Sequence, residues 1–309
     1  MKIGIIDLDT SHPQNWIPIE RELGHDVVAL CDAGAVHPVG YALDFAEQHD
    51  VPRVFPNPQS MVADVDCVIL HGCDWDAHVA NAKPFVEAGK SVLIDKPVAG
   101  NPEDLRTLRR WVDAGARIAG GSSLRYCRET TAFLDTPASE RGTPHTVIAG
   151  CGVDEFNYGI HAYAHLAGLM EGRAARVRHL GGHPQRRVQV EWSDGRTGLV
   201  IVGSVDGWVP FYATAVTEKG AAQFVADPGV LYRALLERCL PYLAGNTDEP
   251  PTPVETWLEP ERWAIAARTS WLQGDRWVDL TELDYSDEAG YDGAAFARQY
   301  RAMRYPTPS

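Results

Sequence analysis

Short apolar runs alternate with amphipathic stretches over the first 123 residues. Five aliphatic or β-branched runs are typical of strands, and they cover residues 4–6, 26–32, 66–72, 91–97 and 116–121. Two stretches between them, 77–90 and 102–115, carry apolar residues at helical spacing. Strands that are apolar on both faces belong to parallel sheets covered by helices. The pattern therefore predicts an α/β, doubly wound domain over residues 1–123.

The pattern changes after Arg125. Residues 158–170 keep helical spacing, whereas polar and apolar positions alternate between 186 and 226 as they do in antiparallel strands. Two glycine-containing turns suit hairpins, and they lie at 193–195 and 218–220.

Two further helices are predicted at 231–245 and 256–274. Together these elements predict an α+β domain with an open, mainly antiparallel sheet over residues 124–309. Because an open sheet usually needs a cover, we expect a homodimer or homotetramer through this C-terminal sheet.

Composition narrows the classes of partner. The chain has a net charge of −14, with 45% hydrophobic and 23% charged residues. Such an acidic chain argues against nucleic acid or an anionic membrane, since both attract positive surfaces. A small-molecule substrate is expected instead. No secretory signal precedes the first strand and the six cysteines show no CxxC spacing, so we expect a cytoplasmic protein with reduced thiols.

The first strand and turn, KIGIIDLDTSHPQNW, lie where a dinucleotide-binding protein places its glycine loop. The three glycine places fall on Asp7, Asp9 and His12. Two carboxylates there would repel a pyrophosphate by ~1 to 4 kcal/mol each at a surface-like dielectric. The helix start is intact, because Thr10 or Ser11 can cap it. The turn is either a modified cofactor loop or a loop with another role.

Asp32 ends the second predicted strand. A carboxylate at this place binds the adenosine ribose hydroxyls and repels a 2′-phosphate, which favours NAD over NADP. An ordinary strand-end cap is the alternative. Because the glycines are absent, the alternative that the protein binds no dinucleotide also remains.

Histidines and carboxylates also gather in the loops 7–12 and 71–78, which follow strands expected to be neighbours. Such mixed ligands suit Mn, Fe or Zn, whereas helix capping and solvated charge are the simpler interpretation. The candidate ligands are Asp7, Asp9, His12, His71, Asp74, Asp76 and His78.

Several motifs together resemble the Gfo/Idh/MocA family of NAD(P)-dependent sugar and polyol oxidoreductases. The tripeptide DKP at 95–97 is similar to the family's Glu-Lys-Pro, and RY at 125–126 to the Arg-Tyr at its domain crossover. NYGIHAYAHL at 157–166 resembles the Asp-x-Gly-x-His motif of the second domain. Residues 264–280 are similar to the family's closing helix, glycine turn and strand. The resemblance implies a Rossmann-type first domain.

The resemblance also assigns roles. Lys96, at the carboxyl edge of the predicted sheet, would orient the substrate and polarise the reacting oxygen, unless it is a surface lysine in an ion pair. His161 would accept the proton from the substrate hydroxyl as the hydride leaves. The family's aspartate is Asn157 here, which can form hydrogen bonds but cannot act as a base.

Other expected site residues fall into two groups. The cofactor-binding set is Asp7, Leu8, Asp9, Thr10, Ser11, His12, Asp32, Asp74, His78, Asp95 and Lys96. Three residues are expected near the substrate, although the last of them could equally be a core histidine: Arg125, Tyr126 and His165.

The leading hypothesis is an oxidoreductase that transfers a hydride between NAD(P) and a sugar, cyclitol or related polyhydroxy compound. A second is a non-redox enzyme on the same scaffold, such as a lyase, isomerase or cyclase, with a metal or without any cofactor. A third is a non-catalytic ligand-binding protein. Lys96 and His161 count against the third.

Overall fold

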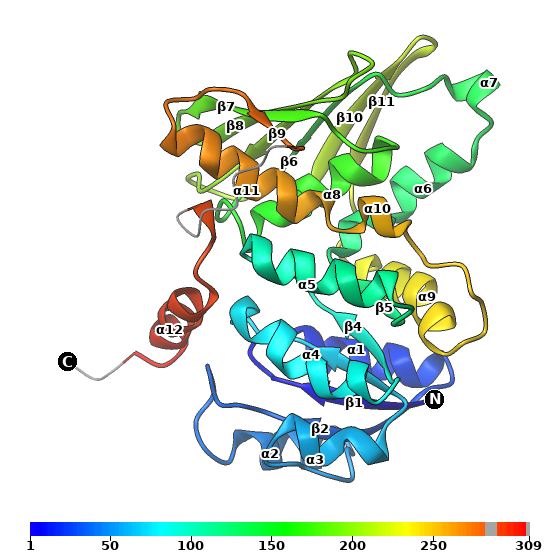
Figure 1. Cartoon of the computed structure of the whole chain (residues 1–309), viewed down its shortest axis with the longest axis vertical. Coiled ribbons are helices and arrows are strands. Elements are labelled where there is room, and N and C mark those ends of the chain that lie inside the picture. The colour runs from blue at the N-terminus through cyan, green and yellow to red at the C-terminus, as the bar shows by residue number, and fades with distance from the viewer. Residues whose placement is uncertain (282–288, 307–309) are drawn as a thin grey trace.

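The computed structural model describes residues 1–281 and 289–306, and it contains two sheets, one above the other in Figure 1. The first sheet has the order β2-β1-β3-β4-β5, and its neighbouring strands are all parallel. Its strands are β1 (Lys2–Ile6), β2 (Asp26–Cys31), β3 (Cys67–Leu70), β4 (Ser91–Ile94) and β5 (Ile118–Gly120). The predicted doubly wound parallel sheet is confirmed.

Helices cover both faces of this sheet. They are α1 (His12–Glu22), α2 (Tyr41–Gln48), α3 (Pro58–Met61), α4 (His78–Glu87) and α5 (Pro102–Asp113). Local signals set their ends: the Asn101 side chain caps α5 by accepting a hydrogen bond from the Asp104 N–H at 2.9 Å, and a proline opens the helix. Two short 3₁₀ turns, η2 (Trp75–Ala77) and η3 (Ser123–Tyr126), follow β3 and β5.

The second sheet has the order β11-β10-β6-β9-β8-β7-β12. It is mainly antiparallel as predicted, with β6 and β9 as a parallel pair. Its strands are β6 (Thr146–Gly150), β7 (Arg176–Gly182), β8 (Arg186–Glu191), β9 (Thr197–Val202), β10 (Tyr212–Thr217), β11 (Gly220–Val225) and β12 (Val278–Asp279). The alternating pattern did not predict β6, β7 or β12.

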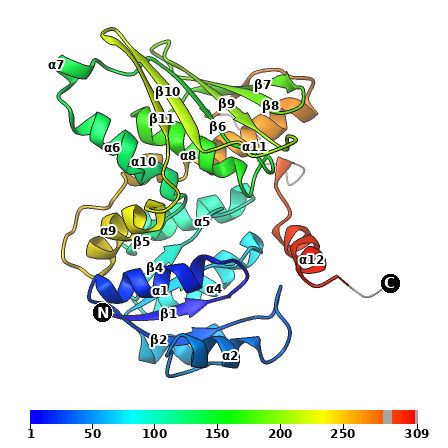
Figure 2. The same ribbon diagram turned by 180° about the vertical axis from the view of Figure 1, so that it is seen from behind.

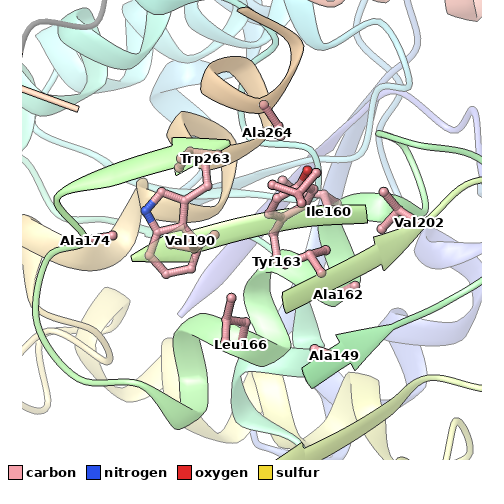
Figure 3. Packing of buried hydrophobic residues seen from close by; sticks show 14 of the residues in the cluster. Ala149, Ile160, Ala162, Tyr163, Leu166, Ala174, Val190, Val202, Trp263 and Ala264 are labelled. Carbon is pink, nitrogen blue, oxygen red and sulfur yellow. The ribbon is translucent and has the colours of Figure 1, made fainter. Parts of the chain in front are cut away.

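The helices of the second half are α6 (Arg128–Asp135), α7 (Ala138–Arg141), α8 (Gly159–Leu169), α9 (Leu231–Leu243), α10 (Val254–Trp257), α11 (Glu259–Leu272) and α12 (Gly293–Arg304). The helix predicted over 256–274 is thus broken at Leu258, and Pro260 lies in the first turn of the new helix, α11. Helices α8 and α11 cover one face of the second sheet. Figure 3 shows Tyr163, Leu166 and Trp263 packed around Val190 in this core.

Two helices from the second half lie against the first sheet. Leu235 and Leu236 of α9 share a core cluster with Ile3 of β1, so α9 completes a helical layer there. Helix α12 returns to the edge where β1, β2 and β3 end (Figure 1). The division between residues 1–123 and 124–309 therefore stays a prediction. Over the described residues, no helix is both long and apolar enough to span a membrane.

Candidate active site

Lys96 lies just beyond β4, where the first sheet meets the segment that leads into α8. Its side chain is buried, and its Nζ donates to the backbone oxygen and the Oδ1 of Asn157, both at 3.1 Å. The ring centroid of Tyr158 lies 5.4 Å from the same Nζ. Burial lowers the pKa of Lys96, and the Asp95 carboxylate opposes that shift. The ammonium is therefore desolvated and held between the two sheets.

His161 lies in the first turn of α8 and is also buried. Its Nδ1 lies 2.7 Å from the Ser122 hydroxyl, which accepts a hydrogen bond from the Leu124 N–H. Burial, and then the charge of Lys96, hold the pKa of His161 well below its usual value. The ring is neutral, and if its Nδ1–H donates to Ser122, Nε2 is left as a base. Sequence analysis missed Ser122, although it stands within the GSSLRY motif.

Asp95 connects this centre to the first turn. Its Oδ2 accepts hydrogen bonds from His12 Nδ1 at 2.5 Å and His71 Nδ1 at 3.0 Å, and its Oδ1 accepts from the Lys96 N–H at 2.7 Å. Burial alone would raise the pKa of the Asp95 carboxyl, but the two imidazoles hold it well below its usual value. Asp95 is therefore a carboxylate that orients both rings. The Tyr232 ring of α9, another residue that sequence analysis missed, lies 4.8 Å from the His12 ring.

The two carboxylates of the first turn point into the protein. Asp7 adopts the left-handed backbone conformation, with φ of 64°, and its Oδ1 accepts from the Ala33 N–H at 3.0 Å. Burial, and then the charge of Asp9, raise the pKa of Asp7 to about 8. Asp9 is fully buried, and its Oδ2 accepts from the Cys73 N–H at 2.9 Å. These aspartates tie the first turn to the loops after β2 and β3.

Other residues expected to bind the cofactor lie in the first turn or directly after β2. Leu8 is buried, and Thr10 Oγ1 accepts a hydrogen bond from the His12 N–H at 3.2 Å. Ser11 precedes α1 but makes no side-chain cap. Asp32 stands at the end of β2, where its Oδ1 accepts from the Gly34 N–H at 3.1 Å. Their contact with a cofactor stays a prediction.

Several of the candidate metal ligands make hydrogen bonds within the protein. Asp74 accepts a hydrogen bond from the Asp76 N–H at 3.2 Å, and Asp76 accepts from the Gly293 N–H at 2.8 Å. Both ring nitrogens of His78 face backbone carbonyls, at 3.0 and 3.1 Å. Helix capping and backbone bonding explain these positions, as they do Asp7 and Asp9. Within the described ranges, the group able to hold a metal ion is His12, His71 and Asp95.

The three residues expected near the substrate have other contacts. Arg125 donates to the backbone oxygen of Thr256 at 3.0 Å, and the Tyr126 hydroxyl lies 2.6 Å from Thr252 Oγ1. His165 Nε2 lies 3.6 Å from the Cys127 sulfur, and burial lowers its pKa to about 4. Arg125 thus contacts α10 and Tyr126 contacts the segment before it, whereas His165 is buried beside Cys127. The roles of these residues near a substrate stay predictions.

The resemblance implies a nicotinamide dinucleotide. The residues expected at its nicotinamide end differ in kind from those expected at its adenosine end. At the end where the resemblance implies the nicotinamide, Lys96 and His161 are buried polar groups, and their catalytic roles stay predictions. At the adenosine end, side chains replace the glycines, and Leu8 and Asp9 are 1% and 0% exposed. Side chains thus take the places of the glycines that let a pyrophosphate approach the backbone, so dinucleotide binding at this end stays a prediction.

The first half of the chain has the parallel sheet, covered by helices on both faces, of a doubly wound fold. Residues 2–118 match the Gfo/Idh/MocA family model, which is described as an oxidoreductase family with an NAD-binding Rossmann fold. The resemblance inferred from the motifs is thereby confirmed.

Curated relatives match over about a third of the chain. They include trans-1,2-dihydrobenzene-1,2-diol dehydrogenase from Homo sapiens, 26% identical over 109 residues, and from Bos taurus, 27% identical over 106 residues. The matches cover 35% and 34% of this chain and 30% of each relative's length. The matches thus span less than a third of the length of these relatives.

Solved structures match over nearly the whole chain. A probable dehydrogenase from Thermotoga maritima has a TM-score of 0.76 at 16% identity, covering 92% of this chain and all of that one. Myo-inositol dehydrogenase from Lactobacillus casei, solved with NAD(H) and myo-inositol, has a TM-score of 0.74 at 17% identity, covering 94% and 99%. At such identities the likeness shows the fold of both parts of the chain.

Proposed function

We propose that this protein is an oxidoreductase that transfers a hydride to or from a CH–OH group of a sugar, cyclitol or related polyhydroxy compound. The observation that carries the proposal is the buried ammonium of Lys96, held by Asn157 beside the neutral ring of His161. Relatives that act on a dihydrodiol or bind myo-inositol support this class of substrate.

The residues divide the proton chemistry between them. Lys96 stabilises negative charge on the substrate oxygen, which its desolvated ammonium does more strongly than a hydrated one. His161 takes or returns the hydroxyl proton at Nε2. Asn157 is a positioning residue, because its amide oxygen holds Lys96 but cannot take a proton. When bound, a nicotinamide would supply the hydride chemistry.

The first test is a titration with NAD, NADH, NADP and NADPH, followed by tryptophan fluorescence or melting temperature. Asp32 predicts a response to NAD(H) in preference to NADP(H). If the folded protein responds to none of the four, the redox proposal fails.

The second test is Lys96→Ala. We expect turnover to fall by about a hundredfold or more while nucleotide binding changes little, because Lys96 acts on the reacting oxygen. Lys83→Ala is the matched control, since Lys83 is 61% exposed in a surface pair with Glu87. An equal loss of turnover and nucleotide binding would contradict the assigned role.

A second candidate is a lyase, isomerase or cyclase that uses the same proton-handling residues without a dinucleotide. The buried Asp9 in a glycine place favours it. This candidate predicts substrate turnover, or exchange of carbon-bound hydrogen with deuterated water, in protein stripped of nucleotide. Strict dependence on added nucleotide would exclude it.

A further inference from the structure

Helix α12 is fastened at its start to the loop after β3. The Asp76 carboxylate accepts a hydrogen bond from the Gly293 N–H at 2.8 Å, so a residue of the first sheet's edge caps the helix. The Phe296 ring lies 5.1 Å from the ring of Trp75. Figure 2 shows α12 beside the edge of the first sheet, and the view of Figure 1 agrees.

The middle of α12 closes a small apolar cluster. Ala297 packs with Val36, from the loop after β2, and with Cys73, from the loop after β3. The three residues are 3%, 0% and 3% exposed. The helix therefore fills the space between two loops that follow neighbours of β1.

The end of α12 is connected to the first turn through His37. Arg301 donates to the backbone oxygen of Gly34 at 2.9 Å, and the Tyr305 hydroxyl lies 2.7 Å from His37 Nδ1. His37 Nε2 lies 2.9 Å from the backbone oxygen of Leu8 and must donate to it. In the neutral ring Nδ1 is then an acceptor, so Tyr305 donates. A chain of hydrogen bonds thus runs from α12 to the place of the missing glycines.

This edge is the one that a dinucleotide uses. In a doubly wound sheet, ligands bind outside the carboxyl ends of the strands, and the acidic residue that ends the second strand marks the adenosine ribose. That residue is Asp32, and Val36 and His37 follow it in the same loop. We propose that α12 occupies the adenosine half of the dinucleotide site and acts as a latch that must leave before a dinucleotide binds. The proposal rests on the proposed redox function.

Helix α12 has fewer buried residues than α8 or α11. Gly293 and Ala297 are its buried residues, out of the 12 residues that it contains. Met303 is 71% exposed. Phe296 and Tyr300 are only partly buried against neighbouring core clusters, so α12 would lose fewer apolar contacts on leaving than α8 or α11. The latch is therefore held by these apolar contacts together with the hydrogen bonds to Asp76, Gly34 and His37.

The test measures NADH binding by fluorescence in the full-length protein and in two opposed variants. The double variant Arg301→Ala/Tyr305→Phe weakens the latch, and we expect it to bind NADH about tenfold more tightly than the unaltered protein, because a larger fraction is open. Ala297→Cys places a thiol against Cys73, and its disulfide, verified by mass spectrometry, should abolish binding until dithiothreitol restores it. Met303→Ala is the matched control and should bind NADH as the unaltered protein does.

Amide hydrogen exchange gives an independent readout. NADH should increase exchange in α12 of the unaltered protein while protecting the first turn. Equal NADH affinity in the double variant and the unaltered protein, with α12 exchange unchanged by NADH, overturns the latch and leaves the redox proposal intact. If even the double variant binds none of the four nucleotides, the latch falls together with the redox proposal. The affinity and exchange measurements decide the matter even where the disulfide does not form.

Discussion

The charges of the first turn depend on burial more than on residue type. On sequence grounds, Asp7 and Asp9 are expected to be two charged carboxylates that would repel a pyrophosphate. In the structure, burial raises the pKa of Asp7 to about 8 and also raises that of Asp9. Asp7 therefore keeps its proton at neutral pH, and the turn carries less charge than the sequence implies.

A pH-dependent cost in stability follows for Asp7. The folded protein holds the Asp7 proton up to about pH 8, whereas the unfolded chain loses it near 3.8, so folding binds a proton between these values. Stability from this group falls as pH rises through that window. Asp7→Asn lacks the cost, so we expect its melting temperature to rise relative to the unaltered protein by ~6 °C between about pH 5 and about pH 8.

The control for Asp7 is Asp113→Asn, which alters an exposed pair with Arg109. Its difference in melting temperature from the unaltered protein should stay constant over the same range. A constant difference for Asp7→Asn as well would show that Asp7 titrates as an ordinary surface carboxyl.

Asp95 carries a second prediction at this scale. Asp95→Asn removes the charge that receives the Nδ1–H groups of His12 and His71 and should lower the free energy of unfolding by about 3 kcal/mol. Urea unfolding measures the change, with Asp113→Asn again as the control, expected within about 0.5 kcal/mol. A loss as small as that of the control would mean that the Asp95 charge does not stabilise the protein through His12 and His71.

At the scale of elements, local signals account for the helices whose ends carry caps. Helix α5 has Asn101 as cap, a proline at its start and acidic residues in its first turn, and it begins at the predicted residue. The break between α10 and α11 also has a local cause, Pro260, which the apolar periodicity of 256–274 concealed. Strand β6 escaped prediction because its short apolar run does not alternate.

Asn101 tests the contribution of such a cap. Asn101→Ala leaves the Asp104 N–H without its acceptor, and we expect a loss of about 1 kcal/mol in the free energy of unfolding. Asn101→Asp keeps an acceptor at the same place and should stay within about 0.5 kcal/mol. Indistinguishable urea midpoints for the two variants would argue against a capping role.

At the scale of the whole molecule, the second sheet has one covered and one open face. Val147, Val200 and Val202 are buried under α8 and α11, whereas Leu199 and Ile201 alternate with them and are partly exposed. An open sheet face with apolar residues favours association, so we propose a homodimer or homotetramer through it.

Sedimentation tests the association. Leu199→Arg places a charge on the open face. We expect this variant to be a monomer where the unaltered protein is an oligomer, because an unpaired charge in an interface is costly. The control is Val39→Arg, at a fully exposed position in the loop between β2 and α2, outside the second sheet. It should not change the assembly. A monomeric unaltered protein would remove the inference.

The sequence by itself determined the order and type of most elements, the class of fold and the place of Lys96 at the end of β4. Those features follow from periodicity, caps and turns, which act between residues a few positions apart. Only the tertiary structure decided that Asp7 and Asp9 turn inward, that His12 meets Asp95 across 83 positions, and that α12 returns to Gly34 and His37. Such contacts depend on how distant elements pack, and no local pattern contains that information.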